Sequence, residues 1–189
     1  METVLVSAAM VAIAEIGDKT QLLAIILAAK FREPVPIILG ILAATLLNHA
    51  AAAAAGYLVA EWLSGSTFQA ILGAAFIAMA GWALIPDKED EGAASGPRGG
   101  IFLTTLVAFF LVEIGDKTQI ATSLLAARFH TIALVAFGTT LGMMAVNVPA
   151  VLFGEAVTRV VPLNYVRMAA AAIFALIGAW IVLGALFRD

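Results

Sequence analysis

The chain has 189 residues, of which 63% are hydrophobic and only 12% are charged, and its formal net charge is −3. Soluble domains are about 45–50% apolar and about 25% charged, so this composition indicates an integral membrane protein surrounded by lipid. The sequence contains no basic tract, which argues against nucleic-acid binding, and no cysteine, which excludes disulfides and thiolate metal sites.

Six apolar segments follow one another along the chain, and a bilayer-spanning helix needs about 20 such residues. We expect membrane helices at 3–29, 35–60, 67–85, 101–127, 131–157 and 165–187. The first segment lacks a preceding basic region, so it is expected to be a retained membrane helix and not a cleaved signal peptide. The predicted fold class is therefore an all-α integral membrane protein with six transmembrane helices.

An acidic stretch rich in glycine separates the third segment from the fourth. We expect a first three-helix repeat at 1–86, an exposed linker at 87–100 and a second three-helix repeat at 101–189. Apart from the two lysines of the repeated motif, most basic residues lie in the loops after the first, third and fifth segments: Lys30, Arg32, Lys88, Arg98, Arg159 and Arg167. The other side carries only Arg128 and Arg188. The positive-inside rule then predicts a cytoplasmic linker and both termini outside.

The heptapeptide EIGDKTQ occurs twice, at 15–21 and at 113–119, and the offset of 98 residues continues without a gap. It relates Phe31 to Phe129, and Trp82 to Trp180. Because three helices make an odd number of crossings, the second repeat must enter the membrane from the opposite side. Such inverted repeats are common in secondary transporters, whose substrate site lies near the midplane.

Each motif places two acids near the centre of a membrane segment, where an acid costs about 2.5–3.5 kcal/mol. Glu15 and Asp18 are three residues apart, so on a continuous helix they would share a face. Glu113 and Asp116 have the same spacing, and a pseudo-twofold axis would bring the four carboxylates together. Gln21 and Gln119 would add amide oxygens to these faces, and Gly17 and Gly115 would allow close helix approach or a local break.

The predicted site is rich in hard oxygen ligands, which suit Ca²⁺, Mn²⁺ or Mg²⁺. Lys19 and Lys117 could each reach back to the glutamate of the same motif or pair with an acid of the other motif. Coupled carboxylates would hold protons when the site is empty and release them to a divalent cation, which predicts proton antiport. The alternative is that the acids and lysines form structural ion pairs, although buried pairs are weak stabilisers.

Polar residues in other segments provide further candidates. Asn48 and His49 lie within the second segment, and the repeat offset relates His49 to Asn147. These three side chains could form ordinary hydrogen bonds between helices, or could support the site and relay protons. The hydroxyls of Thr20, Thr118 and Thr122 could bind the ion or bond back to their own helices.

The paired motifs EIGDKT at 15–20 and 113–118, one per repeat, resemble the Golgi calcium/manganese transporter family, which includes bacterial manganese exporters and belongs to the lysine-exporter superfamily. The resemblance covers essentially the whole chain. It implies a cation/H⁺ exchanger that moves Mn²⁺ or Ca²⁺ out of the cytosol, with Glu15, Asp18, Glu113 and Asp116 binding the ion. It also implies a bacterial plasma-membrane location, because the extra N-terminal segment of many eukaryotic members is absent from this sequence.

The sequence is also compatible with other functions. A small-solute or amino-acid exporter of the same superfamily would need a larger and less acidic pocket, and a passive cation channel would not depend on a proton gradient. An enzyme is not expected, because intramembrane aspartyl proteases carry a differently framed Gly-Asp motif. No cofactor is expected; the expected partners are membrane lipid and the transported cation, and a homo-oligomer is left open.

Overall fold

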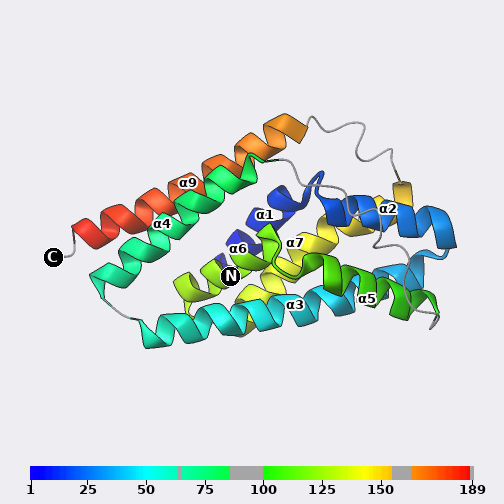
Figure 1. The fold of residues 1–189 in the computed structure, drawn as a ribbon, viewed down its shortest axis with the longest axis horizontal. Helices are drawn as coiled ribbons and strands as arrows, with labels where there is room; N and C mark the ends of the chain where they lie inside the picture. Colours follow the sequence, from blue (N-terminus) through cyan, green and yellow to red (C-terminus); the bar gives the residue numbers. More distant parts are fainter. Residues whose placement is uncertain (64, 86–99, 155–162, 188–189) are drawn as a thin grey trace.

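The computed structural model describes residues 1–63, 65–85, 100–154 and 163–187 (Figure 1). Every secondary-structure element assigned within these residues is an α-helix. In chain order they are α1 (Glu2–Glu15), α2 (Lys19–Phe31), α3 (Pro34–Trp62), α4 (Ser66–Ala83), α5 (Ile101–Glu113), α6 (Lys117–Phe129), α7 (Ile132–Phe153) and α9 (Leu163–Leu186). The predicted linker at 87–100 lies outside the described residues except for Gly100.

Four of these helices are long and apolar enough to cross a membrane, namely α3, α4, α7 and α9. They correspond to the second, third, fifth and sixth predicted segments, and α5 is a shorter apolar helix. Many of their large apolar side chains point outward, including Leu46, Leu47 and Leu176, as expected for helices that face lipid. The prediction of an all-helical membrane protein is confirmed at this level.

The apolar segments at 3–29 and 101–127 are each broken at their motif, which is one of the two arrangements left open for the motif glycines. α1 ends at Glu15 and α2 begins at Lys19, and α5 and α6 are interrupted in the same way between Glu113 and Lys117. Gly17 and Gly115 have φ angles of 78° and 75°, in the left-handed region that only glycine adopts at little cost. The glycine of each motif thus ends the first helix and redirects the chain into the second.

The helix bounds repeat with the offset seen in the sequence. α2 and α6 start and end exactly 98 residues apart, and both are followed by a residue in the left-handed conformation, Arg32 and His130. The long helices α3 and α7 occupy equivalent positions in the two halves and run in opposite directions along the long axis in Figure 1. The two halves therefore have similar local conformations at the motifs and at the start of the long helices, but α3 continues through Gly56 to Trp62 whereas α7 ends at Phe153, before Gly154.

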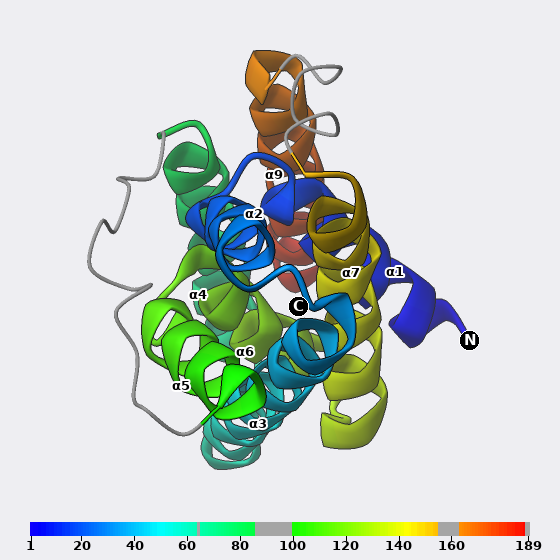
Figure 2. The same cartoon turned by 90° about the vertical axis from the view of Figure 1, so that its right-hand side faces the viewer.

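The halves interlock instead of packing side by side. α1 packs on α7 and α5 packs on α3, so each broken segment lies against the long helix of the other half. Figure 2 looks along the bundle and shows α2 beside α7, which it contacts. Two groups of buried apolar side chains hold the bundle together, one around Phe76, Leu125 and Phe174 and the other around Ile41 and Phe109.

α4 and α9 form a pair along one side of the bundle, visible as neighbouring helices in Figure 1. Gly73 and Gly178 bring their backbones together, because a Cβ on either glycine would lie within 2.8 Å of the carbonyl oxygen of the other. The pair packs against α1 through α9 and against α6 through α4. Within the described residues no comparable interface joins α4 to α5 or α9 to α2, which are the equivalent pairs under the repeat.

Candidate cation site

The two helix breaks carry the four predicted acids into the interior of the bundle. The side chains of Glu15 and Glu113 are 0% exposed, and those of Asp18 and Asp116 are 4% and 3% exposed. Each glutamate is the last residue of its helix and each aspartate precedes the first residue of the next helix. Glutamate and aspartate therefore flank a non-helical turn, and the expectation that they share one helix face is wrong.

Gln21 and Gln119 stabilise these turns. The amide oxygen of Gln21 accepts a hydrogen bond of 2.7 Å from the backbone N–H of Gly17, and that of Gln119 accepts one of 2.6 Å from Gly115. A broken helix leaves backbone groups without their usual partners, and each glutamine satisfies one of them. The glutamines thus act on the backbone in this conformation, and their predicted role as cation ligands stays a prediction.

The first glutamate is held by residues from both halves. Thr20 Oγ1 donates a hydrogen bond to Glu15 Oε1 and lies 3.5 Å from Asp18 Oδ2. Asn147 Nδ2 on α7 donates to the same Glu15 Oε1 at 3.1 Å. The other carboxylate oxygen, Glu15 Oε2, is buried and has no hydrogen-bond partner among the described residues. This oxygen is available to a ligand.

The second glutamate is held by α3. Asn48 Nδ2 donates hydrogen bonds of 3.1 Å to Glu113 Oε2 and to the carbonyl oxygen of Phe110. His49 Nε2 lies 2.8 Å from Glu113 Oε1, in a geometry outside that of an aligned hydrogen bond. Asn48, His49 and Asn147, predicted as supporting residues, therefore all touch a glutamate of the motif.

The lysines connect the motif to other elements. Lys19 Nζ lies 3.3 Å from Asp116 Oδ1, so this lysine pairs with an acid of the other motif, which is one of the two arrangements considered from sequence. Lys117 Nζ donates a hydrogen bond of 2.6 Å to the carbonyl oxygen of Ile85, just beyond α4. The first contact ties the two motifs together, and the second ties α6 to the end of α4.

The three threonines make two kinds of contact, and their predicted role as ligands of the ion stays a prediction. Thr118 Oγ1 lies 3.3 Å from Asp116 Oδ2, much as Thr20 contacts Asp18 in the first motif. Thr122 Oγ1 donates to the carbonyl oxygen of Thr118, within its own helix. Thr20 and Thr118 therefore orient acids, whereas Thr122 bonds back to α6.

The four acids lie near one another, but their carboxylates do not converge on a single position. Asp18, Asp116 and Glu113 are all close enough to Glu15 for their charges to act on it. In the described part of the chain, however, no three His, Asp or Glu side chains converge in a way that could hold a metal ion. The site in this conformation is a group of buried acids that a bound cation would have to draw together.

A small cavity of about 20 Å³ reaches this group from the side of α4 and α9, and Asp18, Lys117 and Arg167 are among its lining residues. One water molecule needs about 10–15 Å³, so the cavity has room for a water-sized particle. Arg167 was considered in the sequence only for its effect on orientation. Its place in the lining of this cavity was missed, because nothing in the spacing relates the sixth predicted segment to the motif.

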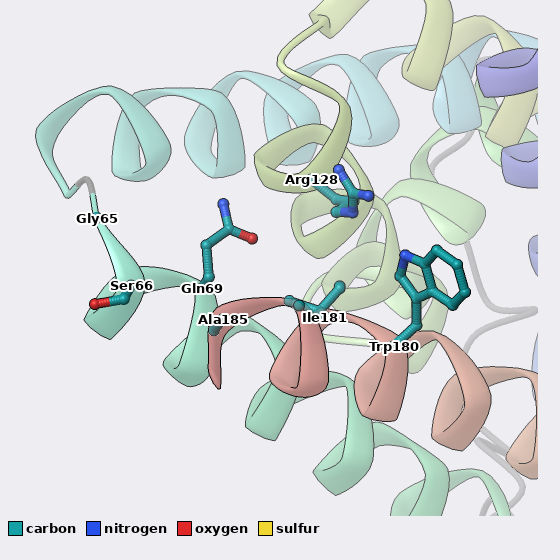
Figure 3. Close-up of a pocket in the computed structure, with 8 residues that line it drawn as sticks. Gly65, Ser66, Gln69, Arg128, Trp180, Ile181 and Ala185 are labelled. Carbon is teal, nitrogen blue, oxygen red and sulfur yellow. The ribbon is translucent and has the colours of Figure 1, made fainter. Parts of the chain in front are cut away.

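A second cavity of about 430 Å³ lies far from the acids, at the opposite end of α6 (Figure 3). Arg128 from α6, Gln69 from α4 and Trp180 from α9 contribute to its lining. Arg128 is twelve residues beyond Asp116, which corresponds to about 18 Å along the helix. None of the motif residues lines this larger cavity.

Comparison with known proteins found one matching family model and a similar named protein. The family model described as "Divalent cation/proton antiporter GDT1" matches the chain twice, over residues 3–91 and 101–189. A protein of Vibrio cholerae serotype O1 named "Putative manganese exporter" is 48% identical over 177 residues, which cover 93% of this chain and 88% of that protein. No solved structure matches.

Proposed function

Because the chain belongs to the divalent cation/proton antiporter family GDT1, we propose that it exports Mn²⁺ from the cytosol in exchange for protons, with Ca²⁺ as a second substrate. The similarity to the named manganese exporter supports Mn²⁺ as the main substrate. The observation that carries the proposal is the burial of four acids at two helix breaks, Glu15 and Asp18 in the first and Glu113 and Asp116 in the second.

The helix breaks favour a cation for a second reason. α1 and α5 both end at a glutamate of the site, and the carboxyl end of a helix carries a partial negative charge. Broken membrane helices commonly use such ends, together with unwound carbonyl groups, to coordinate transported cations. The Lys19–Asp116 pair offsets part of the negative charge while the site is empty. A divalent cation would supply the remaining positive charge.

Proton exchange follows from the chemistry of this group. Acids that are buried close together do not all stay ionised without a cation, so the empty site retains protons. A divalent ion that binds must displace those protons, because its ligands bind it as carboxylates. The protein then returns to its first conformation with protons bound in place of the metal. Binding and release of the two species are thereby coupled at one site.

Alternating access is supported by the repeat and by the packing of α4 and α9. We propose two inverted three-helix repeats at 1–86 and 101–189, joined by a cytoplasmic linker at 87–100, in the inner membrane of a bacterium and with both termini outside. The α4–α9 pair packs on α1 and α6 in this structure. In the opposite conformation, in which the two repeats exchange their roles, the α4–α9 pair would pack on α5 and α2, and the site would open to the other side of the membrane.

The proposal is tested by transport in liposomes. Purified protein is reconstituted, and uptake of Mn²⁺ and of Ca²⁺ is followed with and without an imposed pH gradient. Glu15→Gln and Asp116→Asn remove one acid from each motif with little change in size. The control is Gln69→Leu, which lies in the larger cavity away from the acids.

The expected result is uptake of Mn²⁺ that depends on the gradient, is lost in both acid variants and is retained in the control. Uptake that is indifferent to the gradient would indicate a passive channel. No movement of either divalent ion by protein that remains folded would contradict the proposal and make the acids structural.

A further inference from the structure

The two halves of the site differ at one position where the repeat pairs unlike residues. Asn147 on α7 contacts the first glutamate, and the equivalent position on α3 is His49, which contacts the second. Asn48 adds a further contact to the second glutamate, and its equivalent in the other half is the apolar Val146. The motifs are identical in sequence, but their surroundings are not.

The contact of His49 differs in kind from that of Asn147. The amide nitrogen of Asn147 is fully used, since it donates to Glu15 Oε1 and to the carbonyl oxygen of Met143, each at 3.1 Å. His49 is 0% exposed, and within the described residues neither of its ring nitrogens makes an aligned hydrogen bond. A buried polar atom without a partner is uncommon, and a binding role for the side chain is one explanation of it.

The spacing of His49 Nε2 and Glu113 Oε1 fits two ligands of one cation. Two ligands at right angles on an octahedral ion, each about 2.1 Å away, are about 3 Å apart. The observed separation is 2.8 Å, and neither atom has an aligned hydrogen bond in the described part of the chain. We propose that His49 Nε2 is a nitrogen ligand of the transported cation and sets the preference of the site for Mn²⁺ over Ca²⁺.

The chemistry of the two ions gives the direction of this preference. Ca²⁺ takes oxygen ligands almost exclusively, whereas first-row transition ions also accept imidazole nitrogen. A site made only of carboxylate and amide oxygens would therefore discriminate weakly against Ca²⁺. One nitrogen from α3 beside Glu113 favours Mn²⁺ without changing the number of acids. The inference rests on the proposed function, because it names the substrate preference of the same site.

The first test uses substitutions that copy one half onto the other. His49→Asn gives α3 the residue that α7 has at the equivalent position, and Asn147→His is the reciprocal change. Thr45→Val is the matched control, since Thr45 is also fully buried on α3, one turn before His49. Initial rates of Mn²⁺ and Ca²⁺ uptake are measured for each variant in liposomes, and the ratio of kcat/KM for the two ions is compared.

His49→Asn is expected to lower the Mn²⁺ to Ca²⁺ ratio by about tenfold or more, while Thr45→Val leaves the ratio unchanged. Asn147→His is expected to keep or raise the preference for Mn²⁺. Equal losses for both ions in His49→Asn would overturn the inference, because a purely structural role lowers both rates together. If the wild-type protein carries neither ion, the proposed function fails, and the binding measurement below decides the role of His49 separately.

The second test needs no substitution. The chain has two histidines, and His130 follows α6 at about 20 Å along the helix from Asp116. Electron spin-echo spectroscopy of Mn²⁺ bound to the wild-type protein detects a directly bound nitrogen, and labelling with ¹⁵N-histidine identifies it as imidazole. A histidine signal is expected. Bound Mn²⁺ that shows no nitrogen coupling would overturn the assignment of His49 as a ligand.

Discussion

Lys19 at the start of α2 and Asp116 at the break between α5 and α6 form an ion pair across the two motifs, with 3.3 Å between Nζ and Oδ1. The aspartate side chain is 3% exposed and the lysine side chain 19% exposed. The pair therefore joins the two halves at the point where each helix is broken. Loss of one partner leaves a buried charge without its counterpart, which costs more than the pair itself contributes.

Replacement of Lys19 by methionine should lower the stability by about 1–3 kcal/mol, between the values for exposed and buried pairs. The melting temperature of the protein in detergent measures this loss. The double variant Lys19→Met, Asp116→Asn should recover most of the stability, because both charges are then removed. A double variant that is less stable than Lys19→Met would contradict a direct pairing.

A side chain at Gly115 should strain the left-handed turn. Nothing lies within 4 Å of a Cβ at this position, so Gly115→Ala has only the backbone cost of a positive φ, about 1–2 kcal/mol. Gly115→Asn should be milder, since asparagine adopts this conformation more readily. Gly81→Ala is the control, because Gly81 lies in regular helix with open space around it. Equal melting temperatures for the three variants would exclude strain at the turn.

Contact between α4 and α9 should be sensitive to a single methyl group. A Cβ at Gly178 would lie 2.7 Å from the carbonyl oxygen of Gly73 and 2.7 Å from Ile77 Cγ1. Gly178→Ala should therefore force the helices apart and cost about 1–3 kcal/mol. The same control, Gly81→Ala, adds a methyl group on the same pair of helices without this contact. Thermal unfolding in detergent compares the stabilities of the two variants. Indistinguishable unfolding curves would show that α4 and α9 are loosely packed.

Gln21 should stabilise the first helix break through its amide oxygen. In Gln21→Leu the backbone N–H of Gly17 loses its acceptor, which should cost about 1–3 kcal/mol. Hydrogen exchange at the Gly17 amide reports the loss directly and should become faster. Gln69→Leu makes the same replacement away from the breaks and should leave that amide unchanged. An unchanged exchange rate in Gln21→Leu would show that the bond contributes little.

Mn²⁺ should stabilise the folded protein if it binds at the acids. A ligand at 100 times its dissociation constant adds about 2.7 kcal/mol, so the melting temperature should rise with Mn²⁺ and fall again when a chelator is added. Glu15→Gln should abolish this rise, because Glu15 Oε2 is one of the buried carboxylate oxygens that have no hydrogen-bond partner among the described residues. A rise that persists in Glu15→Gln would place the bound ion elsewhere.

The main elements could be predicted because each has a strong signal in the sequence. Long apolar segments gave α3, α4, α7 and α9, and the repeated heptapeptide singled out the acids that the structure buries. The helix breaks were only one of two possibilities, because a glycine within an apolar segment is compatible with a continuous helix as well as with a turn. The positive φ angles of Gly17 and Gly115 in the folded protein distinguish the two.

The contacts between the halves were less predictable. Spacing within one helix says which residues share a face, but it does not say which long helix of the other half lies opposite. Asn147 and His49 were candidates because of their depth in the membrane, while their separate assignment to Glu15 and Glu113 required the interlocked packing of α1 on α7 and α5 on α3. Lys117 was expected near an acid, and its bond to Ile85 was not anticipated.

The contact of Gly73 with Gly178 also has a mechanical consequence. Where two backbones touch, neither helix can slide along the other without lifting over its carbonyl groups, so a displacement of α4 carries α9 with it. The remaining interfaces of this pair, with α1 and α6, involve separate helices of the bundle. The two helices are therefore expected to move as one rigid unit, and both of them line the small cavity that Asp18 also lines.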